Sequence, residues 1–370
     1  MRVTHTVVRV LDTLDETPLV PGLPEPAEHV GPRELVFVEL HTDDGIDGLG
    51  VTYWHGAMAP ALRAAVEALA RHAVGLDPMR VEQVGTALRR AVGRTSAEGS
   101  GIFHLAMAAI DTACWDIRAK AAGQPLAVLL GGYRDRVPGY ASGALLRGYP
   151  VSLLEQTAGK LLELGFRQLK LQCGDERTPG ESADRVRAVR EAVGPDVELM
   201  LDVNQLWGTH EAVELGASLE PWRLSWIEDP VVPDPAALAQ VALALRTPVT
   251  AGEYAYGVAQ FRHLIEAKAV DIVMIDLLRV GGVTNWLKVA ALAQAHNLPV
   301  VSHRLPELDV QLVSAVPNGL TVEYRPLTAG LFRQAPEFAD GHVLVPDRPG
   351  LGLSLDPGAI RRYQVHEVKA

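Results

Sequence analysis

Seven short apolar runs in the second half of the chain each end at an ionisable residue, and their spacing restricts the fold more than any other feature. The intervals from Asp202 onward, found by subtracting residue numbers, are 26, 25, 23, 27 and 20 residues. This spacing is typical of one strand, one helix and two loops. The residues that close the runs are Lys170, Asp202, Glu228, Glu253, Asp276, His303 and Glu323.

Amphipathic stretches of helical length separate these runs, for example at 181–193, 234–246 and 284–296. Strands that alternate with single helices form consecutive βαβ units, and many such units in a row predict a closed (β/α)8-type barrel. In such barrels the catalytic groups lie at the carboxyl ends of the strands, on one face. We therefore expect an α/β fold in which the seven ionisable residues gather around one barrel mouth.

Alternation of side chains along a strand predicts which neighbours share that mouth. If Asp202 points inward, then Leu199 and Leu201 point outward to the helices, and Asn204 faces the mouth beside Asp202. The same rule places Lys170 and Gln172 together on the inner face of the preceding strand. Gln172 and Asn204 are therefore candidate substrate contacts.

A chain of 370 residues exceeds one ordinary domain, so a barrel with a smaller domain is expected. Residues 1–130 are predicted to form an α+β capping domain, with strands at 1–10 and 34–41 and helices at about 58–74, 78–92 and 99–122. Residues 131–325 are predicted to form the barrel. The tail, 326–370, ends in a strand-like segment that is expected to pack back on the capping domain and complete it.

Composition excludes several classes of protein. A net charge of −11 argues against a nucleic-acid surface, which needs a basic stripe. No apolar run has the length of a membrane span, and the first residues alternate like a strand rather than forming a signal sequence. Cys114 and Cys173 show no metal or redox spacing and are interpreted as free buried thiols of a reducing compartment. We expect a cytoplasmic protein.

Asp202, Glu228 and Glu253 close three consecutive runs, so adjacent strands would bring three carboxylates around one point. Three carboxylate oxygens suit Mg²⁺ and leave further octahedral positions for water and substrate. Carboxylates that close together would repel one another without a cation. The alternative is three separate, salt-bridged acids at loop starts; three in succession favour the metal site.

The next two strand ends predict an acid–base pair. An aspartate such as Asp276 fixes the tautomer of a histidine such as His303, raises its basicity and leaves its second nitrogen free for proton transfer. Lys170 could also move a proton or hold a negative oxygen, although a solvated lysine is an equal alternative. Glu323 could donate a hydrogen bond if burial kept it protonated. Together these groups suit the removal of a proton next to a carboxylate.

These residues resemble the enolase superfamily and, within it, the mandelate racemase subgroup. The resemblance covers essentially the whole chain and rests on DVN at Asp202, EDP at Glu228, AGE at Glu253, D-x-x-R-x-G-G-V-T from Asp276, SH at His303 and VE at Glu323. It implies that Asp202, Glu228 and Glu253 bind Mg²⁺, that Asp276 and His303 form the acid–base dyad, and that Glu323 is an electrophilic donor.

One departure affects the expected reaction. The subgroup usually has Lys-x-Lys on the second barrel strand, whereas this chain reads Lys170-Leu171-Gln172. An amide cannot act as the second base that racemisation needs. The leading hypothesis is therefore dehydration of a 2,3-dihydroxy sugar acid to a 2-keto-3-deoxy acid by one dyad, in a Mg²⁺-dependent lyase. The alternatives are a racemase or epimerase that uses Lys170 opposite His303, and a metal-binding relative without turnover.

The substrate is a small carboxylate that the sequence does not name. The resemblance implies that the capping domain selects it, through the 15–32 loop and the turn that carries Tyr53 and Trp54. His29 and Arg304 are further candidate contacts. The alternative for His29 is a solvated loop histidine, and the alternative for Arg304 is a salt bridge at a helix start. Relatives are commonly symmetric assemblies, so a homo-oligomer is expected.

Overall fold

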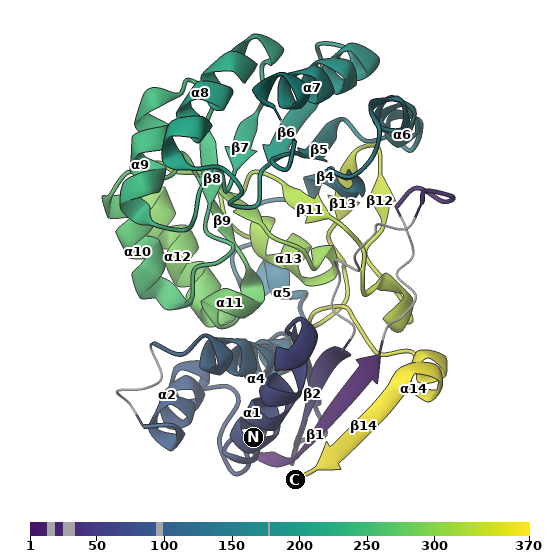
Figure 1. Ribbon diagram of the computed structural model, residues 1–370. Coiled ribbons are helices and arrows are strands. Elements are labelled where there is room, and N and C mark those ends of the chain that lie inside the picture. Colours follow the sequence, from purple (N-terminus) through teal and green to yellow (C-terminus); the bar gives the residue numbers. More distant parts are fainter. Residues whose placement is uncertain (13–18, 25–33, 94–98, 177) are drawn as a thin grey trace.

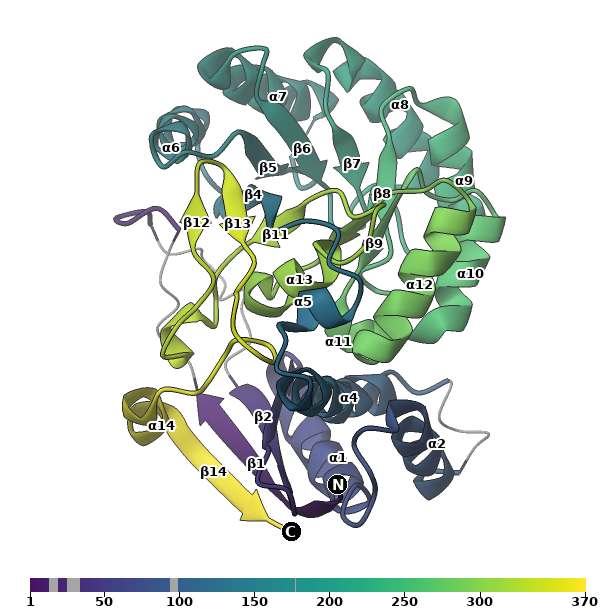
Figure 2. The same cartoon turned by 180° about the vertical axis from the view of Figure 1, so that it is seen from behind.

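The computed structural model describes residues 1–12, 19–24, 34–93, 99–176 and 178–370. Figure 1 shows a small sheet-and-helix cap below a larger barrel, with both chain termini in the cap, and Figure 2 shows the same arrangement from behind. The expected α/β barrel with an α+β cap is confirmed. The limits 1–130, 131–325 and 326–370 stay predictions.

The cap is a four-stranded antiparallel sheet covered by helices. Its strand order is β14-β1-β2-β3, so the tail pairs with the first strand, as expected. The strands are β1 (Val3–Asp12), β2 (Glu34–Thr42), β3 (Gly48–Tyr53) and β14 (Gln364–Lys369). The helices of this half are η1 (Gly56–Met58), α1 (Ala59–Arg71), α2 (Val81–Ala91), α4 (Gly101–Ala121) and α5 (Leu126–Leu129).

Two glycines allow α4 to lie directly on β3. A Cβ atom at Gly48 would lie 2.1 Å from the carbonyl oxygen of Ala113, and one at Gly50 would lie 1.8 Å from that of Ala109. Any side chain would therefore push the helix away from the sheet. This contact fixes the direction in which β3 leaves the cap, towards the barrel mouth.

The barrel has eight strands whose neighbours run parallel. They are β4 (Arg136–Leu145), β5 (Gln168–Gln172), β6 (Glu198–Asp202), β7 (Trp226–Glu228), β8 (Val249–Ala251), β9 (Ile272–Ile275), β10 (Val300–Ser302) and β11 (Val322–Tyr324). The ladder runs from β4 to β10, and β11 pairs with β4. Val300 of β10 bridges to Gly319, just before β11, so the sheet closes into a ring.

Helices cover the outside of this ring, as the alternation in the sequence predicts. They are α6 (Val151–Glu163), α7 (Pro179–Val193), α8 (Thr209–Leu219) followed by η2 (Glu220–Trp222), α9 (Pro235–Ala244), α10 (Gly257–Glu266), α11 (Leu277–Val280), α12 (Val283–Ala295) and α13 (Pro306–Val313). After β11 the chain turns into the tail, with η3 (Ala329–Leu331), β12 (Phe338–Ala339), β13 (His342–Leu344) and α14 (Pro357–Tyr363).

The barrel interior is filled by side chains. Tyr140, Met200, Trp226, Ile272, Met274 and Val301 form a separate buried cluster. Met200 lies two positions before Asp202, whereas Leu199 and Leu201 belong to the large core between sheet and helices. The predicted alternation along β6 is therefore confirmed, and the inner cluster forms a packed floor below the mouth.

Buried acids of α4 join the cap to the barrel. Asp111 accepts hydrogen bonds from the amide and the hydroxyl of Thr284, at 2.9 and 2.5 Å, at the start of α12. Asp116 accepts from the amides of Leu49 and Leu351, at 2.9 and 2.8 Å, and from Lys120. Asp116 therefore connects the start of β3, α4 and the tail.

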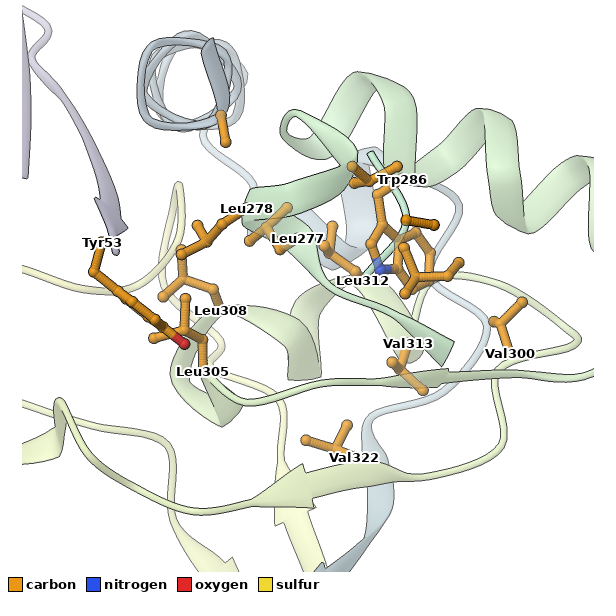
Figure 3. Close-up of a cluster of buried hydrophobic side chains, with 14 of the residues drawn as sticks. Tyr53, Leu277, Leu278, Trp286, Val300, Leu305, Leu308, Leu312, Val313 and Val322 are labelled. Atoms are coloured by element: carbon orange, nitrogen blue, oxygen red, sulfur yellow. The ribbon is translucent and has the colours of Figure 1, made fainter. Parts of the chain in front are cut away.

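The end of β3 is also packed apolarly against the barrel. Tyr53 lies beside Leu305 and Leu308 in the buried cluster of Figure 3, together with Leu277 and Leu278 of α11. Cys114 and Cys173 are buried free thiols, as predicted. Within the described ranges, no helix is long and apolar enough to cross a bilayer.

Candidate active site

The carboxyl ends of the barrel strands enclose a cavity of about 410 Å³. Most of the residues that the sequence singles out line it: Trp54, Lys170, Gln172, Asp202, Asn204, Glu253, His303, Arg304 and Glu323. Glu228 and Asp276 do not line it but contact Lys170 and His303, which do. His29 and most of the 15–32 loop lie outside the described residues.

Tyr53 is not among the residues that line this cavity, and its direct contact with substrate stays a prediction. Its side chain is 5% exposed and lies in a smaller adjoining pocket with Asp276 and Arg279. Burial raises the pKa of Tyr53 to about 12, against the opposing charge of Arg304. Trp54 and His55, the next two residues, supply the contact between the cap and the cavity instead.

Just after several strands, the backbone takes a left-handed conformation that residues other than glycine rarely adopt. Asn204, Asp229 and Arg304 have φ values of 49°, 42° and 57°, each within two residues of a strand end that carries an acid or His303. Such left-handed residues cost free energy and persist where the surrounding structure demands them, commonly at functional sites. These turns direct the side chains at the strand ends into the cavity.

His303 and Asp276 form a close pair. The Nδ1 atom of His303 lies 2.6 Å from Oδ2 of Asp276, and the other carboxylate oxygen accepts the amides of Leu278 and Arg279 at 2.8 Å, so Asp276 caps α11. Burial would raise the pKa of Asp276, but Arg279 and His303 outweigh it and leave the pKa lowered. An ionised Asp276 orients Nδ1–H towards itself, so Nε2 is the nitrogen that can accept a proton when the imidazole is neutral.

The three candidate metal ligands are buried anions on neighbouring strands. Asp202 and Glu228 are register partners on β6 and β7, and both have raised pKa values because of burial and because nearby carboxylates repel further charge. The pKa of Asp229 is raised for the same reasons, and its Oδ2 is buried without a hydrogen-bond partner among the described residues. Buried carboxylate oxygens of this kind fit a hard divalent cation.

Glu253, the third candidate ligand, has a different environment. Burial alone would raise its pKa, but the charges of His303 and Arg279 lower it. Its Oε2 lies 3.2 Å from Nε2 of His303. Across the described part of the chain, no three acidic, histidine or cysteine side chains converge closely enough to hold a metal. The oxygen donors are of the type that Mg²⁺ prefers, but in this structure cationic side chains lie among them.

Lys170 is the main such cation. Its Nζ lies 2.7 Å from Glu228, 2.9 Å from Glu323 and 3.8 Å from Asp202. Burial favours the neutral amine, but the charges of Glu228 and Glu323 outweigh it and hold the pKa of Lys170 well above its ordinary value. Lys170 is therefore an ammonium ion in this arrangement. This environment does not support the alternative in which Lys170 removes a proton opposite His303.

In this structure Glu323 is an acceptor rather than a donor, and its role as an electrophilic donor stays a prediction. Glu323 accepts hydrogen bonds from the hydroxyl of Ser142 at 2.5 Å, from Lys170 and from the amide of Arg304. Burial would raise its pKa, but Lys170 and His303 lower it well below the ordinary range. Donation to a developing oxyanion would require Glu323 to take up a proton. Glu323 instead anchors Lys170 and the turn after His303.

Three arginines that sequence reasoning left out belong to the site. Arg279 donates to the backbone oxygen of Glu253 at 2.9 Å and lies 3.7 Å from Asp276, so it joins the metal ligands to the dyad. Arg147 donates to the side-chain oxygen of Asn204, and Arg325 also lines the cavity. Only Arg279 had a signal in the sequence, its place three residues after Asp276.

The wall also has aromatic and further basic character. Tyr254 and Tyr256, which follow Glu253, line the cavity, and the guanidinium of Arg279 stacks on the Tyr254 ring at 4.8 Å. Arg147 Nε and Arg304 Nη1 are buried nitrogen donors for which the described residues supply no hydrogen-bond partner. Such donors at a cavity wall are suited to an anionic ligand.

Comparison with known proteins agrees with this geometry. A family model described as enolase C-terminal domain-like matches residues 153–359. A second, described as the N-terminal domain of mandelate racemase and muconate lactonizing enzyme, matches residues 16–131. The two matches together cover the cap, the barrel and part of the tail.

Individual relatives match over nearly the whole chain. An L-talarate/galactarate dehydratase from Salmonella typhimurium is 34% identical over 335 residues, 90% of this chain and 83% of that protein. A 3,6-anhydro-alpha-L-galactonate cycloisomerase from Streptomyces coelicolor is 33% identical over 336 residues, 90% of this chain and 92% of that protein. A crystal structure of L-talarate dehydratase from a Polaromonas species, complexed with Mg and L-glucarate, has a TM-score of 0.90 at 33% identity, covering 100% of this chain and 99% of that one.

Proposed function

Because this chain belongs to the mandelate racemase and muconate lactonizing enzyme family of the enolase superfamily, we propose that His303 removes the proton α to a carboxylate and that the enzyme dehydrates a 2,3-dihydroxy sugar acid. The product is a 2-keto-3-deoxy acid. The chain is accordingly a Mg²⁺-dependent enzyme of the lyase and isomerase classes found in this superfamily.

The observation that carries the proposal is a single poised proton acceptor. His303 is paired with an ionised Asp276 at 2.6 Å, whereas the two inward positions of β5 hold an ammonium, Lys170, and an amide, Gln172. Racemisation needs a proton-transfer group on each face of the planar intermediate. Dehydration needs one group when the proton and the hydroxyl leave from the same face, so the arrangement favours dehydration.

His303 performs both proton transfers in this scheme. Its Nε2 accepts the proton from C2, and Asp276 stabilises the resulting imidazolium. The imidazolium then gives that proton to the hydroxyl on C3, the C3–O bond breaks, and water leaves with the proton. The remaining enol rearranges to the 2-keto-3-deoxy acid. No external oxidant or reductant is required.

Asp202, Glu228 and Glu253 would hold the Mg²⁺. When bound, the ion neutralises negative charge that proton removal places on the substrate carboxylate. The protein itself contributes Arg279, which fixes Glu253 and Asp276 relative to each other through its guanidinium. Trp54 and the tyrosines give the cavity wall aromatic surface beside the reacting carbons.

The substrate is further proposed to be a diacid. Arg147 Nε and Arg304 Nη1 point to an anion beyond the one held at the metal site, because buried guanidinium donors without a partner are costly. Bidentate guanidinium contacts select carboxylates. A sugar acid with a carboxylate at each end, such as galactarate, would satisfy both regions. Homo-oligomeric assembly and a cytoplasmic location are also proposals, testable by light scattering and by cell fractionation.

The experiment is incubation with Mg²⁺ in D₂O against paired sugar monoacids and diacids, followed by NMR. We expect a 2-keto-3-deoxy product from a diacid, and none from His303→Asn with the same substrate. Exchange of the α-proton without keto acid would point to epimerisation, and a product isomeric with its substrate would point to cycloisomerisation. Stoichiometric Mg²⁺ binding without exchange on any acid would support a relative without turnover.

A further inference from the structure

Lys170 and the proposed metal ion have the same partners. The ammonium group of Lys170 contacts Glu228 at 2.7 Å and Glu323 at 2.9 Å, and it lies 3.8 Å from Asp202. All four side chains are at most 4% exposed. Two of these three carboxylates are the donors assigned to Mg²⁺. One buried anionic cluster therefore has two possible cations.

Glu228 cannot serve both cations at once with its present contacts. One of its oxygens accepts from Lys170, and the other accepts from the indole nitrogen of Trp226 at 3.2 Å. Both oxygens are therefore engaged. Each oxygen keeps a further lone pair, so the indole can stay bonded beside a metal, but a metal on either oxygen would lie at repulsive range of the Lys170 ammonium, which is 2.7 Å from Oε1.

Lys170 is the donor that can move. Trp226 is 1% exposed and is packed edge-on against Tyr140 in the interior cluster, with ring centroids 5.4 Å apart. Close packing of this kind prevents an indole from turning away. Lys170 instead has a flexible stem and a second anchor, Glu323, which Ser142 and the amide of Arg304 hold in place.

We propose that Lys170 is an internal competitor of Mg²⁺, which leaves Glu228 for Glu323 when the metal binds. This inference rests on the proposed metal role of Asp202, Glu228 and Glu253. It predicts an order of binding, because the ammonium donors of Lys170 become available to the carboxylate of a substrate only after the metal has taken Glu228. Metal and substrate must then strengthen each other's binding by the same factor.

The test is calorimetric titration of MgCl₂ into the wild type, Lys170→Met and Arg304→Met. Removing Lys170 leaves Asp202 and Glu228 without their cation and removes repulsion from the bound metal, so both effects tighten binding. We expect Lys170→Met to bind Mg²⁺ at least about tenfold more tightly than the wild type. Arg304→Met removes a cavity cation that forms no hydrogen bond or ion pair with Asp202, Glu228 or Glu253, and is expected to change the affinity less than about threefold.

A crystal structure of the wild type with Mg²⁺ provides a measurement that does not depend on the variant folding. We expect Lys170 Nζ beyond hydrogen-bond distance of Glu228 and still bonded to Glu323. Unchanged or weaker Mg²⁺ binding by folded Lys170→Met, or a retained Lys170–Glu228 bond beside the bound metal, would overturn the competition. Failure of the wild type to bind Mg²⁺ would overturn the metal assignment itself, which is a different result.

Discussion

Replacing Asp276 by Asn should remove the base while keeping the fold. The Oδ2 atom of Asp276 lies 2.6 Å from His303 Nδ1, while Oδ1 accepts the amides of Leu278 and Arg279. An Asn side chain can keep the oxygen that caps α11 and must then present its amide group to His303. Because that group donates, Nδ1 must accept, and the proton moves to Nε2. The nitrogen that should receive the substrate proton is then already protonated.

The size of the effect follows from the loss of the correct tautomer. A comparable aspartate-to-asparagine change in a hydrolase triad lowers kcat about 10⁴-fold, and general-base catalysis is worth 10² to 10⁴-fold. We expect kcat for keto acid formation to fall by roughly 10³ to 10⁴-fold, about 4 to 5.5 kcal/mol in activation free energy. Thermal unfolding should change little, since the capping contacts remain.

The assay is NMR of product formation and α-proton exchange at saturating Mg²⁺, with unfolding followed by circular dichroism. Asp271→Asn is the matched control, because Asp271 precedes the same strand, β9, at the opposite end of the barrel and accepts the amide of Val249. It should keep kcat within about twofold. If Asp276→Asn retained a tenth or more of the wild-type kcat, the dyad would not be the base.

Three further predictions concern stability and stereochemistry. Burial raises the pKa of Glu307 from 4.5 to about 7, so its contribution to stability is fully present below pH 4.5 and is lost as pH rises through about 7. In urea unfolding, the free energy of Glu307→Gln should exceed that of the wild type by an amount that grows to about 3 kcal/mol between pH 5 and 8. A pH-independent difference would contradict this. Asp116→Ala leaves two buried amides without an acceptor and should lower the free energy of unfolding by about 3 kcal/mol. The control Asp356→Ala, which removes a helix cap, should lower it by about 1 kcal/mol in the same thermal unfolding measurement. Equal losses would argue against a junction role for Asp116. Gln172→Lys restores an amine across the barrel from His303 and should produce the C2 epimer of the substrate in D₂O, detectable by NMR, whereas unchanged stereochemistry would show that an amine on β5 cannot reach C2.

The barrel was predictable because burial on both faces forces parallel strands to be short continuous apolar runs. The run that ends at Asp202 and the four that follow it repeat at nearly constant spacing, and each became a strand. The hairpin of β12 and β13, which extends the sheet beside β4, gave no such signal, because strands of two and three residues have no measurable period. The pairing of β14 with β1 was foreseen only as a tail that returns to the cap.

Site positions were predictable for the same topological reason, since parallel strands place their carboxyl ends on one rim. The charge states of these residues were not predictable from the sequence. Glu323 is ionised because Lys170 lies 2.9 Å away, on a strand that is far from it in the sequence. Arg147 comes from the loop after β4, and no spacing relates it to Asn204, whose side chain it contacts. Which cation neutralises which acid depends on packing that sequence periodicity does not encode.

The charges at the mouth are divided unequally, and this division bears on how metal and base can work side by side. Around β8 and β9 the pKa values of Glu253 and Asp276 are lowered, because Arg279 and His303 compensate burial. Around β6 and β7 those of Asp202, Glu228 and Asp229 are raised, despite Lys170. An added divalent cation therefore gains most at β6 and β7, where negative charge is least compensated. The dyad, whose aspartate is already ionised and capped, keeps its proton acceptor at Nε2 when that cation binds. A single base and a metal can thus share one rim without either neutralising the other.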